Sequence, residues 1–252
     1  MRADQLLVER GLAASRSQAA RLIAGGLRWR LAGEPAWRAV AKNGEELPAS
    51  AELELADTAE SRYVSRGGLK LEGALRAAGA DAKGKRCLDV GQSTGGFTDC
   101  LLQHGAAQVV GVDVGHGQLH ARVRGDARVT AVEKINARSL SVQDLVAAGD
   151  SGAPFDLIVG DLSFISLTLV LPALAPLLAP DGELLMLVKP QFELQPGQIG
   201  KGGIVRDAAL YAQVERRLRE ACSALGLSVA GWHDSAIVGG DGNREFFVHA
   251  VR

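Results

Sequence analysis

Hydrophobic and polar positions divide the chain into two parts with different periodicities. Near the N-terminus, apolar residues three and four positions apart predict two short helices, over 4–10 and 15–25. The second begins at Ser15, whose hydroxyl is placed to form a capping box with Gln18, and it directs Leu22 and Ile23 inward. A weak alternation over 47–56 predicts one small strand, and 58–68 is interpreted as a connector.

Beyond the connector, short apolar runs alternate with helical stretches, a pattern that predicts a parallel sheet covered on both faces. The runs lie at 87–90, 109–114, 128–132, 155–160 and 184–188, and the helices near 97–104, 139–147, 166–178 and 207–225. Strands near 227–237 and 245–251, separated by a Gly-Gly-Asp-Gly turn, form an antiparallel pair. We therefore expect an α/β fold with a mostly parallel seven-stranded sheet over 61–252, preceded by a small α+β domain over 1–60.

The overall composition does not indicate which class of molecule the protein binds. The distribution of charge along the chain is more informative. The 252 residues are 47% hydrophobic and 23% charged, as in ordinary globular proteins, with a formal net charge of -1. Residues 1–30, however, carry six arginines against two acids, a local balance of +4. This excess predicts a basic N-terminal face for nucleic acid, although a solvated helix face explains the same arginines. The face would include Arg16, Arg21, Arg28 and Arg30.

Cysteine usage and hydropathy favour a cytoplasmic protein without a membrane partner. Cys87, Cys100 and Cys222 form no C-x-x-C pair, so neither a disulfide framework nor a zinc site is indicated. The start of the chain has no apolar core of a signal peptide. The longest apolar stretch, 167–178, contains two prolines and is too short to span a bilayer, so we interpret it as a buried helix with its loop.

A glycine-rich segment follows the first strand of the predicted sheet, where open α/β sheets bind ligands. Its spacing is not G-x-G-x-x-G, and Asp89 at its start would repel a phosphate but suits the cationic amino group of a methionine moiety. A tight structural turn is the alternative. Asp113 ends the next strand about 20 residues on, where ribose hydroxyls are usually bound. Together the glycine-rich loop and Asp113 favour a nucleoside cofactor, and the methionine moiety that suits Asp89 makes S-adenosyl-L-methionine the candidate. The loop residues that would contact it are Gly91, Ser93, Thr94, Gly95, Gly96 and Phe97.

Further polar residues lie at strand ends or in the first helix of the second domain. Asn136 follows the third strand and either lines the adenine end of the cofactor or forms a turn. Asp161 ends the fourth strand, Lys189 ends the fifth and Glu245 starts the last, while Lys70 lies in the helix. Each taken singly is an ordinary exposed charge. Together they point to the sheet edge where the cofactor is expected, and Asp161 is counted there as a cofactor contact too.

Several ordered motifs resemble one known family over nearly the whole chain. They occupy 4–11, 15–19, 63–71, 89–99, 112–115, 161–166, 188–193 and 242–245. In these motifs the chain resembles the haemolysin-A-type (TlyA-like) rRNA methyltransferases, whose catalytic domain is similar to the FtsJ-like 2′-O-ribose methyltransferases. The resemblance implies an S4-like RNA-binding domain and methylation of a ribosomal RNA cytidine at its ribose 2′-hydroxyl, leaving S-adenosyl-L-homocysteine. It also implies that Asp89–Gly96 is the cofactor loop and that the catalytic tetrad is Lys70, Asp161, Lys189 and Glu245.

The chemistry implied is an in-line displacement, which requires no metal ion. A base near the ribose oxygen accelerates it, and we assign that role to Lys189. Asp161 and Glu245 are expected to orient Lys189, and Lys70 to position the ribose or tune the base. The like charge of Lys70 would favour a neutral Lys189, whereas the two carboxylates would oppose this, so Lys189 acts either as a base or as an electrostatic clamp.

One segment departs from the family pattern. S4-like domains usually continue into a strand that resembles valine-x-valine-asparagine-glycine, and residues 27–33 replace it here. We therefore expect an altered RNA-binding surface. Three other functions are weighed: a membrane-damaging haemolysin, for which no amphipathic basic helix is found; a non-catalytic RNA-binding protein, which the intact tetrad disfavours; and a NAD-dependent oxidoreductase, which the loop spacing disfavours. The target nucleotide and the oligomeric state are not encoded in any motif.

Overall fold

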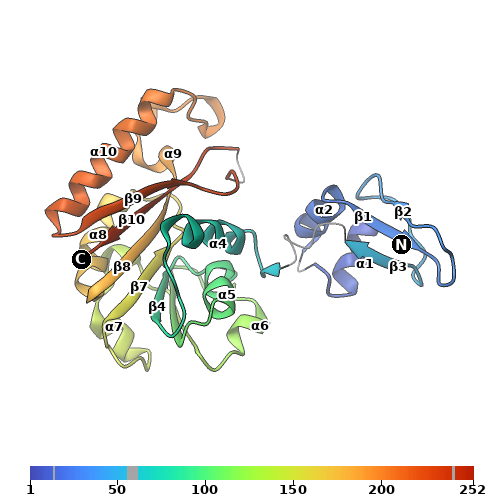
Figure 1. Ribbon diagram of the computed structural model, residues 1–252, viewed down its shortest axis with the longest axis horizontal. Coiled ribbons are helices and arrows are strands. Elements are labelled where there is room, and N and C mark those ends of the chain that lie inside the picture. The colour runs from blue at the N-terminus through green and yellow to red at the C-terminus, as the bar shows by residue number, and fades with distance from the viewer. Residues whose placement is uncertain (14, 56–61, 240–241) are drawn as a thin grey trace. The chain divides into compact units, whose positions relative to one another are not determined.

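The chain divides into two compact units, each with its own core (Figure 1). The computed structural model describes residues 1–13, 15–55, 62–239 and 242–252. The first unit comprises Met1–Arg66 and the second Gly67–Arg252. The predicted boundary between residues 60 and 61 lies outside the described residues.

The first unit packs two helices against a three-stranded antiparallel sheet. Helices α1 (Ala3–Glu9) and α2 (Arg16–Ala24) lie where the apolar spacing predicts them. The Ser15 hydroxyl accepts a hydrogen bond from the Gln18 backbone N–H at 3.2 Å, which is one half of the predicted capping box. Leu22 and Ile23 are buried as expected. The sheet has the order β2-β1-β3, formed by Arg38–Ala39, Leu27–Arg30 and Glu52–Leu55.

The second unit contains a seven-stranded sheet within the described ranges, as predicted. Its order is β6-β5-β4-β7-β8-β10-β9, and β10 runs in the direction opposite to the other described strands. The strands are β4 (Arg86–Val90), β5 (Gln108–Asp113), β6 (Val129–Glu133), β7 (Phe155–Gly160), β8 (Leu178–Val188), β9 (Ser228–Asp234) and β10 (Phe246–Val251). The turn expected between the last two strands includes residues 240 and 241, which lie outside the described part of the chain.

Helices cover both faces of the sheet (Figure 1). Helices α4 and α5 pack on one face, and α7, α8 and α10 contribute to the apolar core on the other. The helices are α4 (Gly67–Ala78), α5 (Gly96–Gln103), α6 (Ala121–Arg124), α7 (Val142–Ala147), α8 (Leu171–Leu174), α9 (Pro190–Glu193) and α10 (Ala208–Ala224). Short 3₁₀ turns lie at Ala137–Ser139, Leu167–Leu169, Ala175–Leu177, Pro196–Gln198 and Lys201–Gly203.

The predicted single helix over 166–178 is wrong in detail. It is a 3₁₀ turn, the short helix α8 and a second 3₁₀ turn, because Pro172 and Pro176 each remove a helical N–H donor. Leu167, Val170, Leu171, Leu174, Leu177 and Leu178 of this stretch are nevertheless buried. No helix in the described part of the chain is long and apolar enough to cross a membrane. Cys87, Cys100 and Cys222 are buried free thiols.

Candidate active site

A cavity of about 460 Å³ opens at the carboxyl edge of the parallel strands. Parallel strands present their carboxyl ends at one edge, so residues that follow different strands meet there. Five of the predicted cofactor contacts line this cavity: Gly91, Ser93, Asp113, Asn136 and Asp161. Thr94, Gly95, Gly96, Phe97 and Asp89 do not line it, and their contact with a cofactor stays a prediction.

The loop after β4 requires glycine at position 91. Gly91 has a φ of 86°, and a Cβ there would lie 2.6 Å from the carbonyl oxygen of Asp161. The backbone N–H groups of Gly91 and Gln92 both donate to the Val112 carbonyl, at 2.9 and 3.1 Å. The loop is thereby fixed between β5 and the residue after β7, with its backbone exposed to the cavity.

The Asp113 carboxylate is oriented at the cavity wall by two backbone donors. Its Oδ2 accepts from the Ser93 N–H and its Oδ1 from the Gly115 N–H, each at 2.7 Å. Each carboxylate oxygen keeps a further lone-pair site, so a ribose diol fits there. Asn136 also lines the cavity, while its side chain accepts the Arg138 N–H at 3.0 Å and caps the following 3₁₀ turn. The turn-forming role of Asn136 is therefore observed, in a position open to a ligand.

Asp89 lies beneath the loop with no exposed surface. Its Oδ2 accepts the Thr98 hydroxyl at 2.7 Å, while its Oδ1 has no hydrogen-bond partner within the described ranges. Burial raises the pKa of Asp89 to about 7, against the opposing effect of the Thr98 hydrogen bond. A buried carboxylate oxygen without a partner is costly, and a cationic group bound near the loop would relieve it. The residues present therefore fit a cofactor with an ammonium group.

The four charged residues of the predicted tetrad form two ion pairs. Lys189 Nζ lies 2.6 Å from Asp161 Oδ1 and donates to the Ser163 hydroxyl at 2.9 Å. Lys70 Nζ donates to Glu245 Oε2 at 2.5 Å, and both of these side chains are at least 90% buried. Burial raises the pKa of Glu245, opposed by the charges of Lys70 and then Lys189 and reinforced by Asp161. All four groups therefore lie within electrostatic range of one another.

Strand topology explains why these residues meet. Asp161 directly follows β7 and Lys189 directly follows β8, at the same edge of the sheet. Glu245 precedes β10, and because β10 is antiparallel, its start lies at that edge, with Phe246 paired to Val188. One expectation changes: Glu245 was expected to orient Lys189, but its hydrogen bond is to Lys70.

Comparison with known proteins identifies the catalytic unit. The family model described as FtsJ-like methyltransferase matches residues 63–252. The chain belongs to this family. The FtsJ-like unit is a Rossmann-like methyltransferase whose methyl donor is S-adenosylmethionine, as the sequence predicted.

Relatives match both units of this FtsJ-like chain. It is 44% identical over 247 residues to the "16S/23S rRNA (cytidine-2'-O)-methyltransferase TlyA" of Mycobacterium tuberculosis, covering 98% of this chain and 88% of that protein. A solved structure described as a putative hemolysin from Streptococcus thermophilus is 40% identical, with a TM-score of 0.75, and covers 100% of this chain and 88% of that chain. A Mesorhizobium loti S-adenosylmethionine dependent methyltransferase, at 18% identity and a TM-score of 0.51, shares the fold; 71% of this chain and 96% of that chain are covered.

Ser163 is the contact of this methyltransferase that sequence reasoning missed. Ser163 is uncharged and lies in a loop, three residues after the end of β7, so it belongs to no periodic pattern in the sequence. Its position two residues after Asp161 was the available signal, because a short loop after a strand brings both side chains to one edge.

Proposed function

We propose that this enzyme transfers a methyl group from S-adenosylmethionine to the ribose 2′-hydroxyl of RNA, with a ribosomal RNA cytidine as substrate. The observation that carries the proposal is the juxtaposition of the pairs Lys189–Asp161 and Lys70–Glu245 at the edge that bears the Asp113 cavity. The relative named as a cytidine-2′-O-methyltransferase supports the choice of substrate.

The bound cofactor supplies an electrophilic methyl group on a sulfonium. Asp113 and Asn136 line the part of the cavity suited to its nucleoside. In its neutral form, Lys189 accepts the proton of the ribose hydroxyl, while Asp161 holds the nitrogen in place and stabilises the ammonium that results. Lys70, fixed by Glu245, positions the ribose. Alignment of the ribose oxygen with the methyl group supplies much of the acceleration.

We propose further that residues 1–60 form an S4-like domain that grips the RNA. Two exposed arginines of this unit have an acidic partner: Arg16 lies 2.8 Å from Asp4, and Arg28 lies 2.9 Å from Glu54. Arg30 pairs likewise with an acid of β3 at 2.6 Å. The side chain of Arg21 lies outside the described part of the chain. RNA phosphates would therefore have to displace these carboxylates from the arginines. This competition makes RNA binding weaker than it would be with unpaired arginines.

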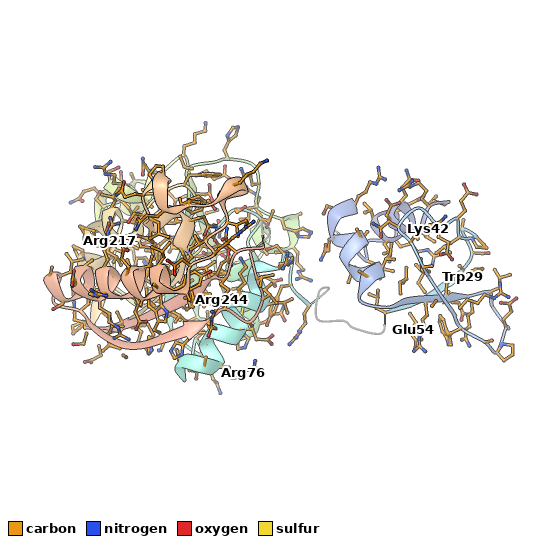
Figure 2. The ribbon with its side chains drawn as sticks, turned by 90° about the horizontal axis from the view of Figure 1, so that it is seen from above. Trp29, Lys42, Glu54, Arg76, Arg217 and Arg244 are labelled. Carbon is orange, nitrogen blue, oxygen red and sulfur yellow. The ribbon has the colours of Figure 1, made fainter. Side chains whose placement is uncertain are left out.

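Arginine–tryptophan pairs lie on or beside the small sheet, in the region where the chain departs from the usual S4-like sequence. The Arg38 guanidinium lies 5.0 Å from the Trp29 ring, and that of Arg30 lies 4.5 Å from Trp37. Trp29 and Glu54 both belong to this sheet (Figure 2). These contacts support the predicted alteration of the RNA-binding surface. A cytoplasmic location fits a ribosomal substrate.

Methyl transfer from tritiated S-adenosylmethionine to ribosomal RNA from cells that lack the gene tests the proposed function. We expect labelled RNA in which one cytidine becomes resistant to alkaline hydrolysis on its 3′ side, and no label with Lys189→Ala. Label on a base or on protein would contradict 2′-O-methylation. RNA binding without methyl transfer would favour a non-catalytic RNA-binding protein. Stabilisation of the protein against heat by NAD but not by S-adenosylhomocysteine would favour an oxidoreductase. Leakage of liposomes would favour a haemolysin.

A further inference from the structure

We propose that Ser163 is a positioning residue that fixes the direction in which Lys189 presents its nitrogen to the ribose hydroxyl. The inference rests on the proposed function. Its basis is that Lys189 has two oxygen partners at the cavity edge, Asp161 Oδ1 at 2.6 Å and Ser163 Oγ at 2.9 Å. Asp161 and Ser163 also line the cavity.

The geometry of a lysine nitrogen makes the second partner significant. A tetrahedral nitrogen has four positions, of which Cε occupies one. The hydrogen bond to Ser163 Oγ occupies a second position and thereby sets the rotation about the terminal bond. Asp161 Oδ1 is an ion-pair partner at 2.6 Å but accepts no hydrogen bond within the described residues, so it does not set that rotation by itself. Ser163 therefore limits the directions in which the neutral amine can accept a proton.

The backbone beside Ser163 is held in an uncommon conformation. Phe164 has a φ of 65°, in the left-handed region that bulky residues rarely adopt. Its side chain is 90% exposed, so the conformation is not explained by burial of the ring in the core. The Phe164 ring lies 5.0 Å from that of Phe192, in α9 directly beyond Lys189. This ring contact ties the Ser163 loop to the turn that carries Lys189.

A second anchor joins the same two segments. Glu193 of α9 is 4% exposed; its Oε2 accepts the Ser166 hydroxyl at 2.6 Å and its Oε1 accepts the Leu167 N–H at 2.7 Å. The segment 161–167 is thus fastened to 189–193 at three successive places. Such fastening preorganises the Ser163–Lys189 contact before any ligand binds.

The contact acts on the proton-transfer step. As the oxygen–methyl bond forms and the methyl–sulfur bond breaks with its electron pair on sulfur, the ribose proton moves to the free position on Lys189 Nζ. Ser163 neither gains nor loses a proton. Its loss should lower the rate of the chemical step by about tenfold, the size expected for one hydrogen bond, and leave substrate binding unchanged.

Side-chain NMR of the ligand-free protein provides a readout that does not depend on activity. The Lys189 ammonium signal, assigned by its loss in Lys189→Arg, should show faster hydrogen exchange with solvent in Ser163→Ala than in wild type. Ser163→Thr retains a hydroxyl and should restore slow exchange. Ser151→Ala, which removes another exposed loop serine, should change nothing. In parallel, kcat should fall about tenfold in Ser163→Ala with the KM for RNA unchanged.

Unchanged exchange at Lys189 in a folded Ser163→Ala protein would overturn the proposal. Failure of Ser163→Thr to restore slow exchange, with its melting temperature equal to that of wild type, would do the same. A wild-type protein that methylates no RNA would remove the proposed function, whereas the exchange comparison would still decide whether Ser163 holds the Lys189 nitrogen.

Discussion

Lys70 and Glu245, 175 positions apart in the chain, form a buried ion pair with 2.5 Å between Nζ and Oε2. Removal of one partner from such a pair leaves an uncompensated buried charge. Lys70→Met should therefore destabilise the protein by about 3–5 kcal/mol, measured by urea unfolding. The double variant Lys70→Met, Glu245→Leu should recover most of this loss. A double variant as unstable as the single one would show that packing, and not charge, sets the cost.

Lys189→Arg separates a base from an electrostatic clamp. Arginine keeps the positive charge and can pair with Asp161, but with a pKa above ~12 it cannot accept a proton at neutral pH. We expect single-turnover methyl transfer to be lost while RNA binding and S-adenosylhomocysteine binding persist, as measured by filter binding and calorimetry. Transfer at close to the wild-type rate would assign Lys189 as a clamp.

Asp113→Ala should weaken S-adenosylmethionine binding by about 1.5–3 kcal/mol, because the ribose hydroxyls lose an ionised acceptor. The same change releases the backbone N–H groups of Ser93 and Gly115, so part of the loss could come from the loop. Asp113→Asn, which keeps one carbonyl oxygen, is the control. Calorimetry checks both variants, and wild-type affinity in Asp113→Ala would remove Asp113 from the cofactor site.

Asp89 should make folding stability fall as the pH rises from about 4 to about 7. Its pKa is raised from 3.8 to about 7 in the folded chain, mainly by burial. The unfolded chain therefore releases its proton first, and the contribution of Asp89 declines by up to ~1.4 kcal/mol per pH unit in that window. Asp89→Asn should remove this part of the slope in urea unfolding between about pH 4 and about pH 7. The exposed Asp181→Asn serves as the control and should leave the slope as in wild type.

Release of one arginine from its acidic partner should strengthen RNA binding. Glu54→Gln removes the carboxylate that lies 2.9 Å from Arg28, so the guanidinium becomes available to a phosphate. The log-log dependence of affinity on salt should steepen by about 0.7 for one added contact with single-stranded RNA. Arg28→Ala should flatten the slope, and Arg76→Ala in α4 is the matched control. If neither Arg28→Ala nor Glu54→Gln changed the salt dependence of RNA affinity, Arg28 would belong to a solvated face that does not contact RNA.

The sequence predicted the sheet well because its central strands, such as β4, β7 and β8, contain nearly continuous apolar runs. Three of the four residues of the proposed tetrad were singled out because they lie directly beside such runs, at β7, β8 and β10, and the family resemblance implied the set of four. Strands β1 and β2 were missed because they are only four and two residues long, too short for an alternation to stand out. The charges of their arginines are satisfied by Glu54, Glu52 and Glu34, which no local pattern reveals.

Partnerships across the chain were the least predictable. Glu245 was assigned to Lys189 because both adjoin strands, but its partner is Lys70, which α4 brings from the face of the sheet. The contact of Ser163 with Lys189 lies beside the positive φ of Phe164, and neither feature has a sequence signature. Likewise, Asp89 is at a ligand-binding edge, yet its side chain points to Thr98 beneath the loop.

The position of β10 near the end of the chain determines which parts of the site are translated first. Strands β4 to β8 and the residues that line the cavity all precede it in the chain, whereas β10 inserts between β8 and β9 only after both have been made. In a nascent chain the residues proposed to hold the methyl donor are therefore translated before Glu245, and Lys70 gains its partner last. The proposed donor site and the carboxylate that completes the proposed tetrad are made at different moments, separated by translation of the segment from β8 to β10.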